Sequence, residues 1–151
     1  MKIERLYTRR IVATRRSAPI AEAAAVMQRY EVGSLVVMED LPGAGEPVGI
    51  VTDRDLAIQG FASESSTVGS VMTPVIATIH DSADIHEALE TMRAHGVRRL
   101  LVVAADGGLR GILSIDDVVD GLSADLAAAA AVLKGEIRRD AAGLGDVKVG
   151  G

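Results

Sequence analysis

A seven-residue pattern near the middle of the chain returns near its C-terminal third. Residues 49–55 read GIVTDRD, and residues 111–117 read GILSIDD. Both copies follow the order glycine, two apolar residues, serine or threonine, two variable residues and aspartate. Taken alone, each copy predicts a buried strand that ends at a hydroxyl N-cap, with a carboxylate in the first turn of the following helix. Because the pattern occurs twice, it also indicates a shared chemical role.

The start of a helix is a common site for phosphate, because its backbone N–H groups have no partners within the helix. Asp55 and Asp117 argue against phosphate at these two helix starts, since a carboxylate already satisfies the positive end and repels a second anion. A carboxylate in this position accepts hydrogen bonds from a diol, as the acidic residue of dinucleotide-binding folds does with ribose. Thr52 and Ser114 place a hydroxyl nearby. The doubled motif therefore predicts ribose recognition, with any phosphate bound by cationic groups elsewhere.

Catalysis is the first alternative to this interpretation. Neighbouring carboxylates that might act as acid and base occur at both helix starts, as Asp53 with Asp55 and Asp116 with Asp117. Helix capping and diol binding explain their position better, and no nucleophile paired with a base is visible in the sequence. We therefore expect no enzymatic activity.

The histidines are the second alternative, as metal ligands. His80, His86 and His95 are separated by six and nine residues, which does not place them on one helical face at i and i+4. The chain has no cysteine, so it has no thiolate ligands and no disulfides. We expect surface histidines and no metal site.

Composition excludes further classes of function. The 151 residues include 48% hydrophobic ones, but only two tyrosines and one phenylalanine, and the net charge is −5. So few aromatic rings cannot stack the bases of a single strand, and a negative chain has no general attraction for a phosphate backbone. No apolar run approaches the ~18 residues that span a bilayer. We expect a cytoplasmic protein that binds neither nucleic acid nor membranes.

An internal repeat organises the chain. Shifting the sequence by 65 residues places 2–38 on 67–103 without a gap, with eleven identities that include Thr8 with Thr73. The shift falls to 62 at Gly49, because the loop MEDLPGAGEP makes the first copy longer.

Each copy predicts the order strand, helix, strand, strand, helix. The first would use residues 9–14, 17–30, 34–38, 47–51 and 53–59, and the second 74–78, 82–95, 98–103, 109–113 and a helix from 114. Ser17 and Ser82 are the expected N-caps of the first helix in each copy. Neither unit buries its sheet well alone, so we expect an α+β fold in which the two pack face to face.

A long amphipathic helix follows the second copy. Its apolar residues recur every three or four positions, at Val118, Leu122, Leu126, Ala129, Leu133 and Ile137. The pattern predicts a helix to about Arg139 and a frayed tail after it. Such a stripe needs a partner surface, and we expect a homodimer.

The repeat length, the order of elements and the two closing motifs together resemble a tandem pair of cystathionine-β-synthase (CBS) domains, also called a Bateman module, of the small stand-alone bacterial type. The segments TVGSVMTP and TDRD resemble it as well. The resemblance covers residues 2–122. It implies two β-α-β-β-α repeats related by a pseudo-two-fold axis, over 2–62 and 67–122. The apolar periodicity beyond them predicts a helical extension over 123–139, and we expect a flexible tail over 140–151.

In this family, adenosine-containing ligands bind in clefts between the repeats, so the resemblance implies two crossed sites. Site one would comprise Ile50, Thr52, Arg54 and Asp55 with Ala83, Val97, Arg98 and Arg99. Site two would comprise Ile112, Ser114, Asp116 and Asp117 with Ala18, Val32, Gly33 and Ser34. The implied function is a regulatory sensor of AMP, ADP or ATP that requires no cofactor and controls an unidentified partner protein. Alternatives are a binder of S-adenosylmethionine or NAD(H), and a dimerisation module whose clefts stay empty.

The two sites differ in charge. Where site one has Arg54, Arg98 and Arg99, the matching positions of site two are Asp116, Gly33 and Ser34. A phosphorylated ligand should therefore prefer site one, because a charge pair at about 4 Å contributes up to ~4 kcal/mol at an effective dielectric constant of 20.

Overall fold

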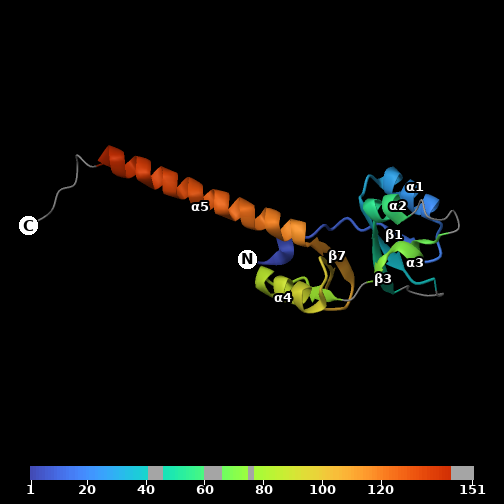
Figure 1. Cartoon of the computed structure of the whole chain (residues 1–151). Helices are drawn as coiled ribbons and strands as arrows, with labels where there is room; N and C mark the ends of the chain where they lie inside the picture. Colours follow the sequence, from blue (N-terminus) through green and yellow to red (C-terminus); the bar gives the residue numbers. More distant parts are fainter. Residues whose placement is uncertain (41–45, 60–65, 75–76, 144–151) are drawn as a thin grey trace, which may run out of the picture.

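The chain forms two small β-sheets, which lie at the opposite end of the molecule from the outer part of α5 (Figure 1). The computed structural model describes residues 1–40, 46–59, 66–74 and 77–143. The first sheet has the order β1 (Ala13–Arg15), β2 (Ser34–Met38), β3 (Pro47–Thr52) and β4 (Thr73–Pro74). The second has the order β5 (Thr78–His80), β6 (Arg99–Val103) and β7 (Leu109–Ser114). In each sheet the first pair of strands is parallel and the others are antiparallel.

Helices connect and flank these strands. They are the 3-10 helix η1 (Ile3–Arg5) and the α-helices α1 (Ile20–Tyr30), α2 (Asp53–Gln59), α3 (Val68–Val71), α4 (Ile85–His95) and α5 (Ile115–Gly143). The predicted α+β fold of two similar repeats followed by a C-terminal helix is confirmed. The short elements η1, α3 and β4 were not predicted from the sequence. Residues 41–45 of the long loop in the first copy, Gly60 at the expected helix end, and residues 75–76 of the strand expected over 74–78 lie outside the described residues.

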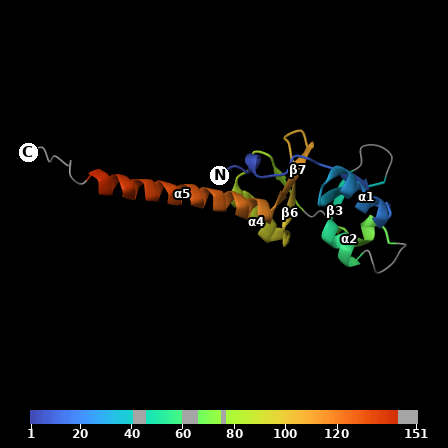
Figure 2. The ribbon, with the colours of Figure 1, turned by 90° about the horizontal axis from the view of Figure 1, so that it is seen from above.

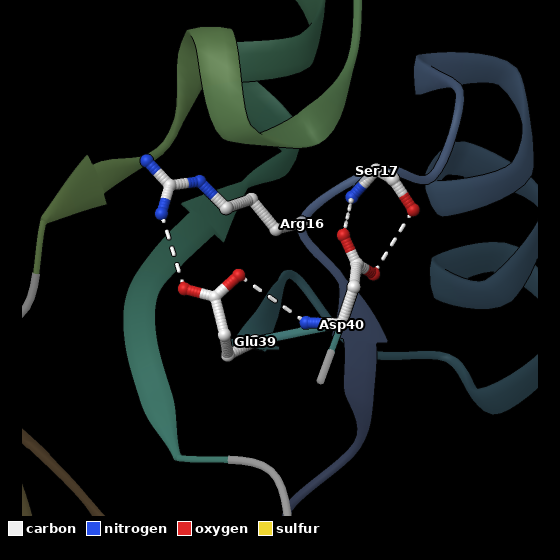
Figure 3. Close-up of polar contacts among 4 residues, drawn as sticks. All are labelled: Arg16, Ser17, Glu39 and Asp40. Atoms are coloured by element: carbon white, nitrogen blue, oxygen red, sulfur yellow. Dashed lines mark hydrogen bonds and ion pairs between the residues drawn. The ribbon is translucent and has the colours of Figure 1, made fainter. Parts of the chain in front are cut away.

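The predicted N-caps Ser17 and Ser82 are wrong. The hydroxyl of Ser17 donates to Asp40 Oδ1 at 2.9 Å and its backbone N–H donates to Asp40 Oδ2 at 3.0 Å, while Arg16 pairs with Glu39 at 3.2 Å (Figure 3). These bonds join the end of β1 to the end of β2, and α1 begins only after Pro19. In the second repeat Asp84 caps α4, accepting the Glu87 N–H at 2.9 Å.

The two repeats exchange their leading segments. Ile3, from the start of the chain, is fully buried in the core of the second repeat, and its N–H donates to the Ala83 carbonyl. Val68, from the segment before the second repeat, is fully buried in the core of the first, and its N–H donates to the Ala18 carbonyl. Each repeat therefore completes its partner's core, which explains why neither unit should fold well alone.

The two sheets meet through a third core cluster. It contains Val36 and Ile50 from the first sheet and Leu101 and Ile112 from the second, all of them buried. Side chains alternate between the two faces of a strand, so one face of each sheet packs on its own helices and the other on the opposite sheet. The predicted face-to-face packing of the repeats is confirmed.

Helix α5 extends well beyond this body. In Figures 1 and 2 it leaves from the end of β7 and projects away from both sheets. Val118 in its first turn is fully buried, and Leu6 lies against Gly121. The helix runs to Gly143, further than the Arg139 end expected from the sequence, and the remainder of the tail, 144–151, lies outside the described residues.

Gly135 offers a direct measurement of helix propensity in α5. A Cβ atom placed there meets nothing within 4 Å. Alanine is favoured over glycine inside a helix by about 0.5–1 kcal/mol, so Gly135→Ala should slow hydrogen exchange of the neighbouring α5 amides by about two- to fivefold. Exchange at an unchanged or faster rate in the variant would contradict this prediction.

Candidate functional site

The doubled motif forms the same hydrogen-bonded turn at the starts of α2 and α5. Asp55 Oδ2 accepts the Thr52 N–H at 2.9 Å, and the Asp55 N–H donates to Thr52 Oγ1 at 3.1 Å. In the second copy, Asp117 Oδ2 and Ser114 Oγ make the same bonds, at 2.9 and 3.1 Å. In both copies the aspartate accepts through Oδ2, so that among the described residues Oδ1 of each aspartate is left for another donor.

Both copies of the motif need glycine at their first position because another segment of backbone passes close to it. In β7, a Cβ atom on Gly111 would be too close to the Thr8 carbonyl oxygen and would approach Tyr7 Cδ2 to 2.6 Å. In β3, a Cβ atom on Gly49 would lie 2.9 Å from the Thr73 carbonyl oxygen. The exchanged segments thus pass directly over both motif strands, and only glycine admits them at this distance.

A cavity of about 720 Å³ lies where the two motifs meet. Both predicted sites contribute to it. Seven predicted members of site two line it, Val32, Gly33, Ser34, Ile112, Ser114, Asp116 and Asp117, together with five from site one, Thr52, Arg54, Asp55, Arg98 and Arg99. The two motif carboxylates therefore belong to one shared space.

A second cavity, of about 280 Å³, adjoins the first and shares three of its lining residues, Thr52, Arg98 and Arg99. It brings Ile50 and Thr52 of the first repeat together with Val97 of the second, as the crossed arrangement of site one requires. Pro74 and Leu101 add further apolar surface. This smaller cavity has the aliphatic lining that suits a flat heteroaromatic ring.

Ala18 and Ala83 occupy a different place from the other predicted site residues. Both are buried in the cores of their repeats, and their carbonyls accept the N–H groups of Val68 and Ile3. Neither is among the residues that line the two cavities. The exchanged segments border the cavities instead.

Thr8 and Thr73 are the members of these exchanged segments that the sequence-based site omitted. Thr8 pairs with Ile112 and lines the larger cavity, whereas Thr73 pairs with Ile50 and lines the smaller one. Their identity under the 65-residue shift was the signal that marked them. Other lining residues absent from the prediction are Arg10, Glu31, Asp53, Ile115, Pro74, Gly96 and Leu101.

Charge in the larger cavity is mixed. Four arginines line it, Arg10, Arg54, Arg98 and Arg99, with five carboxylates, Glu31, Asp53, Asp55, Asp116 and Asp117, so the formal sum is 4 − 5 = −1. Arg98 and Arg99 face both cavities, which means that the cations assigned to site one also border site two. If a phosphorylated ligand prefers site one, the preference must come from where the individual arginine side chains lie, because the two sites share Arg98 and Arg99.

The three histidines do not line either cavity. Within the described residues, no three histidine or acidic side chains come together as a possible metal ligand set. His95 Nδ1 lies 2.9 Å from the Thr91 carbonyl, and His80 Nδ1 lies 3.4 Å from the Ser82 hydroxyl. No helix in the described ranges combines the length and hydropathy needed to cross a bilayer.

Comparison with known proteins decides the family. The sequence profile of the CBS domain matches the chain twice, over residues 3–59 and 68–124. The chain belongs to the CBS-domain family. The matched limits differ by one to three residues from the repeats expected over 2–62 and 67–122. The predicted tandem pair of CBS domains is confirmed.

Relatives of this CBS pair differ in what accompanies the two repeats. An uncharacterised 17.7 kDa protein of Acidianus ambivalens is 30% identical over 80% of this chain and 73% of its own length. Several inosine-5'-monophosphate dehydrogenases also match, but the chain spans only about a fifth of their length. The similarity to those enzymes is therefore no evidence for catalytic activity in this chain.

Two similar solved structures contain a nucleotide. The CBS domain protein PAE2072 from Pyrobaculum aerophilum, complexed with AMP, is 29% identical, covers 78% of this chain and 89% of its own, and has a TM-score of 0.60. The protein CBSX2, also in complex with AMP, is 28% identical over 80% of this chain and 95% of its own, with a TM-score of 0.58.

Proposed function

We propose that this CBS pair is a regulatory module that binds an adenine nucleotide between its repeats and conveys the occupancy to a partner protein. The observation that carries the proposal is the pair of carboxylates at two helix starts, Asp55 and Asp117, which line one inter-repeat cavity together with arginines. The AMP complexes of PAE2072 and CBSX2 support the choice of ligand.

The lining suggests how AMP would be oriented at site one. Adenine fits the apolar part of the smaller cavity, near Ile50, Val97 and Leu101. Oδ1 of Asp55 would then accept from the ribose hydroxyls, because Oδ2 already holds the Thr52 N–H. The phosphate would extend toward Arg98 or Arg99, whose guanidinium groups suit oxyanions. In this proposal the carboxylates bind and orient a ligand and take part in no reaction.

A thermal-shift series tests the proposal against its alternatives. A ligand at 100 times its Kd adds about 2.7 kcal/mol of stability, which is roughly 5–10 °C in Tm for a chain of this size. We expect that shift with AMP, ADP or ATP and none with inorganic phosphate at the same concentration. If only S-adenosylmethionine or NADH raises Tm, that compound and not an adenine nucleotide is the ligand. If none of these compounds raises Tm, the result favours an interaction module with empty clefts.

A further inference from the structure

The larger cavity contains the motif residues of both proposed sites. Thr52 and Asp55 of site one and Ser114 and Asp117 of site two all line it. Its volume of about 720 Å³ equals that of a cube with edges of about 9 Å, which is close to the ~8 Å Debye length at physiological ionic strength. Salt therefore screens only part of the interaction between charged groups that two ligands bring into this cavity.

Arg98 and Arg99 are the cations that border both cavities. The matching positions of the first repeat hold Gly33 and Ser34, which carry no charge. The two repeats therefore supply one such pair of arginines for two sites. Two ligands with phosphate groups would have to compete for this pair.

The backbone of this arginine pair is held at the second motif. The Arg98 carbonyl accepts the Ile115 N–H at 2.8 Å, and Arg99 pairs with Ser114 in the sheet. Within the described part of the chain, neither arginine forms an ion pair with any of the five carboxylates that line the same cavity. Both guanidinium groups are therefore available to an anion, and their attachment to the second motif explains why arginines assigned to site one also border site two.

We propose that the two nucleotide sites are negatively coupled through Arg98 and Arg99, so that the first nucleotide to bind weakens the binding of the second. This inference rests on the proposed function and concerns how its two sites are filled. A phosphate monoester carries close to two negative charges at neutral pH, and charge-assisted hydrogen bonds to both arginines satisfy it. Two arginines and five carboxylates then remain in the lining of the larger cavity, a formal charge of −3. A second phosphate meets this negative lining as well as the first phosphate.

Negative coupling makes occupancy respond in two steps. Coupling between two binding sites usually changes affinity about 5- to 150-fold, and each ligand weakens the other by the same factor. The module would hold one nucleotide over a wide range of concentration and two only above that range. A partner protein could then distinguish a moderate from a high nucleotide concentration.

Calorimetric titration with AMP separates coupling from a simple difference between the sites. Asp55→Asn removes the ribose acceptor of site one, so AMP enters site two while site one is empty. We expect the Kd of that step to be at least about tenfold lower than the Kd of the second step in the wild type. Adenosine carries no phosphate, so with adenosine the same two values should agree within about twofold.

Asp53→Asn is the matched control for the loss of a charge. It removes one carboxylate from the same cavity and the same helical turn but keeps Asp55. Asparagine can still accept the Arg54 N–H that Asp53 Oδ1 accepts at 2.8 Å. The Kd of its second AMP step should stay within about threefold of the wild-type value, because both sites still fill.

The double variant Arg98→Gln/Arg99→Gln tests the shared cations. It should weaken the first AMP step by at least about tenfold and change adenosine binding by less than about twofold. Arg9→Gln is its control, because Arg9 lines neither cavity and donates instead to the Glu4 carbonyl at 2.8 Å. A first AMP step that survives the loss of both arginines would contradict the proposal.

Two further results would overturn the coupling. One is the same Kd for AMP at site two in the wild type and in Asp55→Asn, and the other is coupling of equal size with adenosine. In both cases AMP still binds the wild type, so the coupling fails while the proposed function stands. A wild type that binds no AMP would overturn both.

Discussion

Asp55→Asn is expected to weaken AMP binding by about 10- to 100-fold, which is the largest effect that the site predicts. Asparagine keeps a carbonyl oxygen that can accept the Thr52 N–H, so the start of α2 survives the change. Its amide group cannot accept a hydrogen bond from the ribose, as Oδ1 of aspartate does. Hydrogen bonds to a charged group contribute about 1.5–3 kcal/mol, and this range corresponds to the stated loss of affinity.

The comparison that decides between the two sites is Asp55→Asn against Asp117→Asn, measured by calorimetric titration with AMP and ATP. We expect the larger loss from Asp55→Asn, because Thr52, the hydrogen-bond partner of Asp55, also lines the smaller cavity with Arg98 and Arg99, whereas Ser114, the partner of Asp117, lines only the larger cavity. If Asp117→Asn abolishes tight binding while Asp55→Asn leaves it intact, the second repeat holds the working copy of the motif.

Asp84→Asn is the matched control for both variants. Asp84, like Asp55 and Asp117, accepts a backbone N–H at the start of a helix, here as the N-cap of α4, but it does not line either cavity. The Glu87 N–H hydrogen bond holds the pKa of Asp84 below its usual value, with smaller contributions from Lys2 and the amino terminus. Asp84→Asn makes the same chemical change as the two test variants at a helix start away from the cavities. The affinity for AMP should therefore not change.

Gly111→Ala is expected to destabilise the fold by about 1–3 kcal/mol and to lower Tm by roughly 3–10 °C. The added methyl group would press on the Thr8 carbonyl and on the Tyr7 ring. The segment cannot easily retreat, because Thr8 N–H donates to the Ile112 carbonyl at 2.9 Å and Ile112 N–H donates to the Thr8 carbonyl at 3.1 Å. Relief of the clash would break these bonds or shift β7.

Gly135→Ala provides the comparison, since it adds the same methyl group in open space and should not lower Tm. Because Thr8 also lines the larger cavity, Gly111→Ala should weaken nucleotide binding as well as stability. A Gly111→Ala protein that unfolds at the wild-type temperature would show that the exchanged segment does not press on β7 as described.

Much of the architecture was predictable from the chain alone, because the evidence for it is periodic. Apolar runs such as SLVVM matched β2 residue for residue, and the 65-residue shift identified two copies of one unit. The capping bonds of Thr52 and Ser114 were also local enough to predict. The role of Ser17 was not predictable in this way, because its hydroxyl donates to Asp40, across the end of the sheet, rather than accepting an N–H at the start of the helix.

The tertiary structure decided which repeat each segment completes. Ile3 and Val68 look like ordinary apolar residues in the sequence, and nothing local indicates that each is buried in the other repeat. That exchange brings Thr8 and Thr73 to the cavities while Ala18 and Ala83 remain in the cores. The sequence by itself determined the motifs, their helix caps and the carboxylates they present, since these depend on residues three positions apart. The composition of the cavities depended on contacts between residues about a hundred positions apart, such as Thr8 with Ile112, and only the packed fold specifies those.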